Sequence, residues 1–89
     1  MIKCTLLYTS RAIKDINKLP YHLKKRIFYA ISEIKKDPYE HVKKLKLSAK
    51  TTLYSMRVGE YRVIMSIKDP VCIIEVVRVG NRSKVYRDY

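Results

Sequence analysis

A run of period-two alternation in the C-terminal half of the chain constrains the fold more than any other feature of the sequence. Three segments, Leu53 to Val58, Tyr61 to Lys68 and Val71 to Val79, are rich in β-branched and aromatic residues. Gly59-Glu60 and Asp69-Pro70 separate these segments, and both dipeptides are typical of tight turns. The pattern therefore predicts a meander of three antiparallel strands.

The N-terminal half predicts one strand followed by two helices. Apolar residues alternate from Ile2 to Tyr8, as in a strand. Thr9-Ser10 then offers N-cap hydroxyls, and helical spacing of apolar residues continues until Pro20. A longer helix follows up to Asp37-Pro38, with an apolar stripe of Leu23, Ile27, Ala30, Ile31 and Ile34. The lysine-rich stretch 39–50 has weak periodicity and is expected to be a basic loop or a short irregular strand.

These elements predict an α+β fold in a single domain spanning residues 1–89, with element order β-α-α-β-β-β. We expect an antiparallel sheet with a two-helix hairpin packed on one face, because 89 residues allow one modest core. Charges interrupt every apolar run before it is long enough to cross a bilayer, and the N-terminus lacks the pattern of a secretion signal. The chain is therefore expected to be cytoplasmic, with no membrane partner.

The two cysteines and three of the eight tyrosines are assigned to the interior. Cys4 and Cys72 lie far apart in apolar segments without the spacing of a metal site, so buried free thiols are favoured over a disulfide and no zinc site is expected. Tyr8, Tyr29 and Tyr61 are expected in the core.

The Gly59-Glu60 turn predicts a pair of arginines on one face of the sheet. A two-residue loop pairs Arg57 with Arg62 across the ladder. The helix-facing side would then carry Tyr54, Met56, Val58, Tyr61, Val63, Met65 and Ile67. Opposed like charges are unfavourable by about 0.2–1 kcal/mol, so an anion between them would stabilise the pair. The alternative is that both arginines are simply solvated.

The net charge of +12 and the C-terminal composition point to an anionic partner. The C-terminal cluster of Arg78, Arg82, Lys84, Tyr86, Arg87 and Tyr89 suits single-stranded RNA, because arginine binds phosphate and tyrosine stacks on bases. A tail that only aids solubility remains the alternative. His22 and His41 do not form an acid–base pair, and the carboxylates are scattered rather than grouped for metals. Phosphoryl chemistry would therefore rely on cations, with no metal or cofactor.

Several short motifs together resemble the RelE/ParE toxin superfamily, specifically the RelE messenger-RNA interferases. They include Gly-x-Tyr-Arg at 59–62 and Val-Gly-x-Arg at 79–82, followed by Val85-Tyr86. Further matches are Arg11-Ala12-Ile13-Lys14, Lys18-Leu19-Pro20, Asp37-Pro38-Tyr39 and Lys44-Leu45-Lys46. The resemblance implies a toxin that cuts messenger RNA in the ribosomal A site and is held inactive by an acidic, RelB-like antitoxin.

The resemblance also implies roles for individual residues. Arg62 and Arg82 would neutralise charge on the phosphorane, Tyr86 would orient the base beside the cut, and Arg57 takes the place of a strand lysine. The residues expected to bind the RNA backbone are Lys44, Lys46, Lys50, Lys84 and Arg87. Ser55 stands where relatives often have another lysine, which leaves the general base unassigned. The alternatives are a ParE-like inhibitor of DNA gyrase and a basic RNA-binding module without activity.

Overall fold

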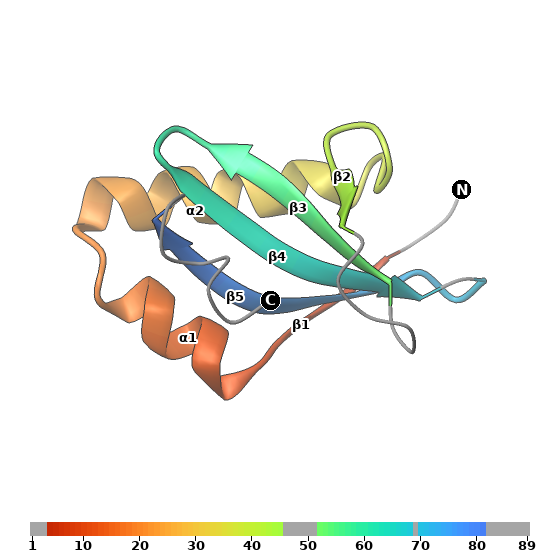
Figure 1. Cartoon of the computed structure of the whole chain (residues 1–89), viewed down its shortest axis with the longest axis horizontal. Coiled ribbons are helices and arrows are strands. Elements are labelled where there is room, and N and C mark those ends of the chain that lie inside the picture. The colour runs from red at the N-terminus through yellow and green to blue at the C-terminus, as the bar shows by residue number, and fades with distance from the viewer. Residues whose placement is uncertain (1–3, 46–51, 69, 82–89) are drawn as a thin grey trace.

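The computed structural model describes residues 4–45, 52–68 and 70–81, which form a helical layer against a five-stranded sheet. The elements in chain order are β1 (Thr5–Tyr8), α1 (Ser10–Asn17), α2 (Tyr21–Ile34), β2 (Lys43–Leu45), β3 (Leu53–Val58), β4 (Tyr61–Lys68) and β5 (Ile73–Asn81). Figure 1 shows α2 crossing behind the sheet while α1 lies along its β5 side. The predicted α+β fold is confirmed. Neither of these helices is long and apolar enough to span a membrane.

The strand order is β1-β5-β4-β3-β2, and the sheet is mixed. Strands β3 to β5 form the predicted antiparallel meander, with a bulge in the β4–β5 ladder. The lysine-rich stretch, expected as a basic loop or a short irregular strand, contributes the short strand β2, which pairs antiparallel with β3. Strand β1 instead pairs parallel with β5, Thr5 opposite Ile73 and Tyr8 opposite Val76. The expectation of a wholly antiparallel sheet is corrected at this edge, because the chain reaches β5 only after the whole meander and places β1 beside its far side.

Helix α1 begins at the cap that the sequence predicted. Thr9 Oγ1 accepts a hydrogen bond from the Ala12 backbone N–H at 3.0 Å and donates one to the Val77 carbonyl at 2.7 Å. The same hydroxyl therefore starts the helix and ties it to β5. Further along the same helix, Asp15 Oδ2 accepts a hydrogen bond from the Val79 backbone N–H at 3.0 Å and another from Arg78 Nε at 3.2 Å.

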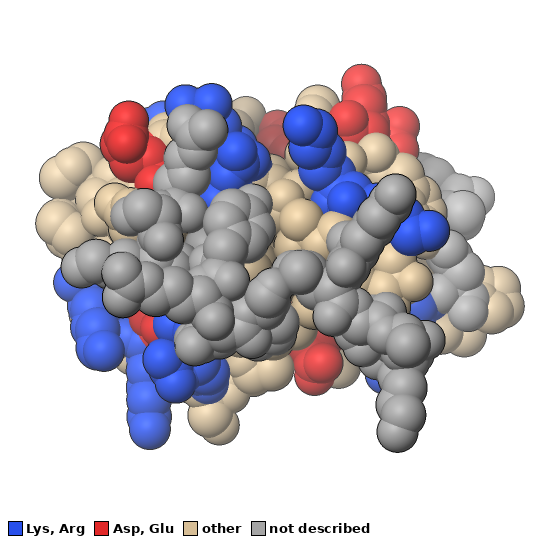
Figure 2. All heavy atoms as spheres, viewed as in Figure 1, with Lys and Arg blue, Asp and Glu red and all other residues tan. Residues whose placement is uncertain are grey.

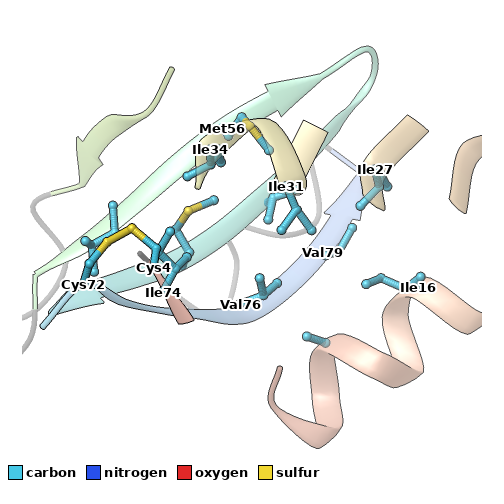
Figure 3. Close-up of a cluster of buried hydrophobic side chains, with 14 residues drawn as sticks. Cys4, Ile16, Ile27, Ile31, Ile34, Met56, Cys72, Ile74, Val76 and Val79 are labelled. Atoms are coloured by element: carbon cyan, nitrogen blue, oxygen red, sulfur yellow. A yellow bond between two sulfur atoms is a disulfide. The ribbon is translucent and has the colours of Figure 1, made fainter. Parts of the chain in front are cut away.

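The core lies between the helices and the sheet, as Figure 3 shows. Helix α2 contributes Ile27, Ile31 and Ile34, which are almost completely buried. The predicted helix-facing set is confirmed in full, because all seven side chains belong to this cluster or pack against it. Tyr29 was expected here and is 67% exposed, so that prediction is wrong. It lies on the solvent side of α2, between the positions that point to the sheet.

Cys4 and Cys72 form a disulfide, so the expectation of free thiols is wrong. The parallel pairing of β1 with β5 is the physical reason, since Thr5 opposite Ile73 brings the two preceding residues to a Cα–Cα distance of 4.7 Å. The Thr5 backbone N–H donates to the Cys72 carbonyl at 2.9 Å beside the bond. Both cysteines are buried.

Candidate functional site

The β3–β4 turn brings together the site that the sequence predicted. Gly59 has φ of +60°, a left-handed conformation that glycine adopts without strain. The ladder on either side pairs Val58 with Tyr61 and Arg57 with Arg62, which confirms the predicted register. The two guanidinium groups therefore come from directly opposed positions on the sheet face away from the helices, the open face.

The two arginines differ in their surroundings. Arg57 is exposed, and its Nε donates to the Gly59 carbonyl at 3.2 Å. Arg62 is half-buried, and its Nε is shielded from solvent with no hydrogen-bond partner among the described residues. An unsatisfied buried donor costs about 1–3 kcal/mol. An oxyanion bound between the two guanidinium groups would relieve the like-charge contact across the ladder.

Strand β2 adds a lysine to the open face that sequence reasoning missed. The register pairs Lys43 with Ser55 and Leu45 with Leu53, and Leu45 packs against the open-face pair Leu53 and Ile64. Lys43 therefore shares the arginine face. It lies diagonally across from Arg57, at a spacing of about 7–8 Å between such positions that long side chains can bridge.

Lys44 lies on the other side of the sheet from the arginine pair. It is paired with Tyr54, which packs against the helix-side core and meets Tyr39 edge-to-face. The side-chain period of two in a strand explains why neighbouring lysines face opposite ways. Lys43 is two residues before Leu45, so in a strand the two side chains share a face. This alternation, read on the assumption that the stretch forms a strand, was the signal that would have selected Lys43.

The end of β5 lies beside Arg62. Gly80 pairs with Arg62 and Asn81 with Tyr61, so the described part of the strand ends at the arginine pair. The neighbouring Arg78 does not join that pair, because it is 13% exposed and bound to Asp15 of α1. The predicted site residues Arg82, Lys84, Tyr86 and Arg87, together with Lys46 and Lys50, lie outside the described residues.

The open face is a mixture of cations, buried hydroxyls and a small apolar cluster. Ser66 Oγ is a second shielded polar atom without a hydrogen-bond partner among the described residues. The apolar cluster consists of Leu45, Leu53, Ile64 and Val77. On the part of this face that the described residues form, Figure 2 shows Lys and Arg side chains at the hairpin end of β3 and β4. Ser66 lies on the same face as Arg62 but four residues further along β4, next to Leu53 rather than to Arg57.

No ion pair within residues 4–45, 52–68 and 70–81 joins Arg57 or Arg62 to a carboxylate. The same residues contain no group of three His, Cys, Asp or Glu side chains placed to hold a metal ion. Glu33, on the outer part of α2, is paired with Lys36 at 2.9 Å, and the hydrogen bond from Lys36 lowers the pKa of the Glu33 carboxyl. Asp15 and Glu40 are likewise paired with residues other than Arg57 and Arg62.

A separate hollow lies between β1 and the two helices. It has a volume of about 220 Å³ and is lined by Tyr8, Ile13, Ile16, Asn17 and Phe28. Ile13 and Phe28 remain 48% and 46% exposed, and burial raises the pKa of the Tyr8 hydroxyl. The hollow is apolar and carries no catalytic set.

Comparison with known proteins places this arrangement among toxins. The family model described as the ParE toxin of type II toxin–antitoxin systems matches residues 6–86. Toxin RelG of Mycobacterium tuberculosis is 29% identical over 84 residues, covering 93% of this chain and 95% of that protein.

Solved structures of toxin–antitoxin complexes contain chains with a similar fold. The chain resembles one in the toxin–antitoxin complex RelBE2 from Mycobacterium tuberculosis, with a TM-score of 0.79 and 26% identity over 91% of this chain and all of that one. A chain of the archaeal RelE–RelB complex from Pyrococcus horikoshii has the same fold, with a TM-score of 0.79 and 22% identity over 94% of this chain and all of that one.

Proposed function

The chain belongs to the ParE toxin family of type II toxin–antitoxin systems, within the RelE/ParE superfamily, and from this premise we propose that it is a RelE-type endoribonuclease. It cuts messenger RNA in the A site of the ribosome and so stops translation in the cytoplasm. The observation that carries the proposal is the opposed pair Arg57 and Arg62, with a shielded Arg62 Nε that has no partner among the described residues.

The reaction is an in-line transfer within the RNA. The 2′-oxygen attacks the adjacent phosphorus and loses its proton, the bond from phosphorus to the 5′-oxygen breaks, and that oxygen gains a proton. The products are a 2′,3′-cyclic phosphate and a 5′-hydroxyl. Arg57 and Arg62 stabilise the extra negative charge of the phosphorane, which is greater in the transition state than in the substrate.

Further roles come from the family resemblance. Arg82 adds a second source of positive charge at the phosphorane, and Tyr86 orients the base beside the cut. The RNA backbone is held by Lys44, Lys46, Lys50, Lys84 and Arg87, to which the register of β2 adds Lys43. The mechanism uses cations of the chain and needs no metal or cofactor.

The natural inhibitor is an acidic, RelB-like antitoxin. The net charge of +12 attracts an acidic partner, and the apolar hollow beside Ile13 and Phe28 can take the apolar side of an amphipathic helix. RelE–RelB complexes among the structural relatives support a partner of this kind.

Mapping of RNA 5′ ends in a translating extract tests the activity. We expect cuts phased to the reading frame, bearing 5′-hydroxyl ends, that persist when free divalent ions are chelated after ribosomes are stabilised. Cuts in naked RNA that need metal and leave 5′-phosphates would reject the mechanism.

Inhibition of DNA gyrase by binding is the second candidate, and the match to a ParE family model favours it. That function does not require the Arg62, Arg82 and Tyr86 set, so retention of all three supports the RNase. A supercoiling assay with purified gyrase separates the two functions. Inhibition there, with no cuts in the translating extract, would establish the alternative. A module that only binds RNA would be inactive in both assays.

A further inference from the structure

Arg26 of α2 lies against the turn that holds the arginine pair. A methyl group placed on Gly59 would be 3.5 Å from both terminal nitrogens of the Arg26 guanidinium and 3.7 Å from its central carbon. These nearly equal distances mean that the whole guanidinium, not one N–H, covers the turn. Figure 1 shows the β3–β4 turn lying over α2. The guanidinium of a residue on α2 thus lies at the turn of the β3–β4 hairpin.

The guanidinium N–H groups of Arg26 form no hydrogen bond with the part of the chain that the structure describes. No hydrogen bond or ion pair joins Arg26 to a residue in it, although Glu60 stands in the same turn. Arg57 approaches the turn from its other side, through its bond to the Gly59 carbonyl. Three guanidinium groups, those of Arg26, Arg57 and Arg62, therefore lie around one two-residue turn, and none of them is paired with a carboxylate of the described residues.

Such a cluster suits a chain of phosphates better than a single anion. Arg57 and Arg62 project from the open face, whereas Arg26 reaches Gly59 from the helix side. The three guanidinium groups therefore approach the turn from two sides of the sheet. A guanidinium binds phosphate oxygens through paired N–H donors. An RNA strand that bends around the hairpin end can present successive phosphates to the two sides.

We propose that Arg26 is a third phosphate-binding residue, which holds the single-stranded RNA backbone next to the phosphate bound by Arg57 and Arg62. The inference deepens the proposed ribonuclease function and rests on it for the identity of the RNA. Arg26 binds a phosphate beside the reacting one, so it contributes to substrate affinity rather than to the chemical step.

Binding of a labelled single-stranded RNA with 2′-O-methyl groups tests the role of Arg26, because methylation blocks the attack and isolates binding. The full-length chain is compared with Arg26→Ala over a range of salt concentrations. We expect affinity to fall about tenfold and the log–log salt slope to decrease by about 0.7, the value for one lost phosphate contact on a single strand.

Lys25→Ala is the matched control, since it removes the same charge from the adjacent position of α2. The Lys25 ammonium lies 5.5 Å from the centre of the Tyr21 ring, at a different place from the turn. We expect near wild-type affinity for this variant and intermediate affinity for Arg26→Lys, which keeps the charge and loses the fork. Thermal unfolding of each variant checks that the fold is intact.

Two results would overturn the inference. The first is a loss of RNA affinity in Arg26→Ala that is no greater than the loss in Lys25→Ala, and the second is no measurable RNA binding by the wild-type chain. A translating extract keeps this failure separate from that of the proposed function. If the wild-type chain makes no cuts there, the ribonuclease is rejected while the binding comparison still decides the role of Arg26. If it cuts and Arg26→Ala requires no more ribosome for half-maximal rate than Lys25→Ala, Arg26 alone is rejected.

Discussion

At the scale of single residues, side-chain direction in the sheet decides which cations can act together. Arg57 and Arg62 share the open face because they are paired across β3 and β4. Lys43 joins them through its pairing with Ser55, whereas Lys44 is paired with Tyr54 on the helix side. A positive net charge attracts polyanions in general, but only groups on one face of a sheet can converge on one phosphate.

Replacement of Arg62 separates catalysis from binding. Arg62→Ala removes a donor whose contact strengthens as charge develops, so single-turnover cleavage at saturating ribosome should slow by about 100-fold or more. Ribosome affinity should fall far less, because many other cations remain. An unchanged rate at saturation would show that Arg62 has no part in the chemical step. Single-turnover cleavage and ribosome pelleting supply the two measurements.

The two neighbouring lysines of β2 provide an internal comparison. Lys43→Ala should weaken binding of single-stranded RNA more than Lys44→Ala, although both variants lose one charge, because only Lys43 shares the face of the arginine pair. We expect the salt slope to fall by about 0.7 for Lys43→Ala. A larger loss for Lys44→Ala would mean that RNA follows the helix side of this sheet edge.

At the scale of elements, two interactions hold the N-terminal elements onto β5: a disulfide beside β1 and a set of hydrogen bonds from α1. The disulfide joins the residues that precede β1 and β5. Asp15 of α1 accepts hydrogen bonds from β5 at the backbone of Val79 and the side chain of Arg78. Both ties position β5, whose far end pairs with Arg62.

Reduction of the disulfide should lower stability. The bond closes a long stretch of chain, with a sequence separation of 68, so its loss should reduce the free energy of unfolding by about 2–4 kcal/mol. Urea unfolding with and without reductant measures the difference. A Cys4→Ser/Cys72→Ser double variant should respond to neither condition. An equal midpoint for oxidised and reduced wild-type chain would contradict the prediction.

Replacement of Asp15 should lower the free energy of unfolding substantially. Asp15→Ala leaves the Val79 N–H and the 13%-exposed Arg78 without this acceptor, and breaking such a pair costs about 3 kcal/mol. Asp15→Asn should cost less, because its amide oxygen still accepts from Val79. Arg11→Ala is the control, since Arg11 contacts Asp15 at 3.6 Å from an exposed position and should change stability little. Similar urea midpoints for Asp15→Ala and Arg11→Ala would argue against this tie.

At the scale of the whole molecule, the arginines of the hairpin end and the apolar hollow lie in different places. The arginines surround the β3–β4 turn, whereas the apolar hollow lies between β1 and the helices. A partner that neutralises the toxin can therefore use charge to associate quickly and apolar contact to stay bound.

The cognate antitoxin should be acidic and its association rate should fall steeply with salt. Ile13→Ala should raise the dissociation rate, because a half-exposed apolar side chain of the hollow is lost, while the salt dependence of association stays unchanged. Surface plasmon resonance at several ionic strengths measures both rates. A cognate partner that is basic, or that associates independently of salt, would contradict this account.

The sequence by itself determined the local elements and the register of the central hairpin. The Thr9 cap follows from hydroxyl chemistry, and the pairing of Arg57 with Arg62 follows from a two-residue turn. The motifs around Gly59 and Val79 also identified the superfamily, which the comparisons confirmed. Each of these features depends on residues close together in the chain.

The tertiary structure alone decided which distant segments became neighbours. The parallel pairing of β1 with β5 joined Cys4 to Cys72, the β2 register selected Lys43, and packing of α2 carried Arg26 to Gly59. Local propensity and periodicity state which face of an element is apolar, but not which partner covers it or at what register. Those choices depend on the free energy of the whole packed core, to which residues more than sixty positions apart contribute together.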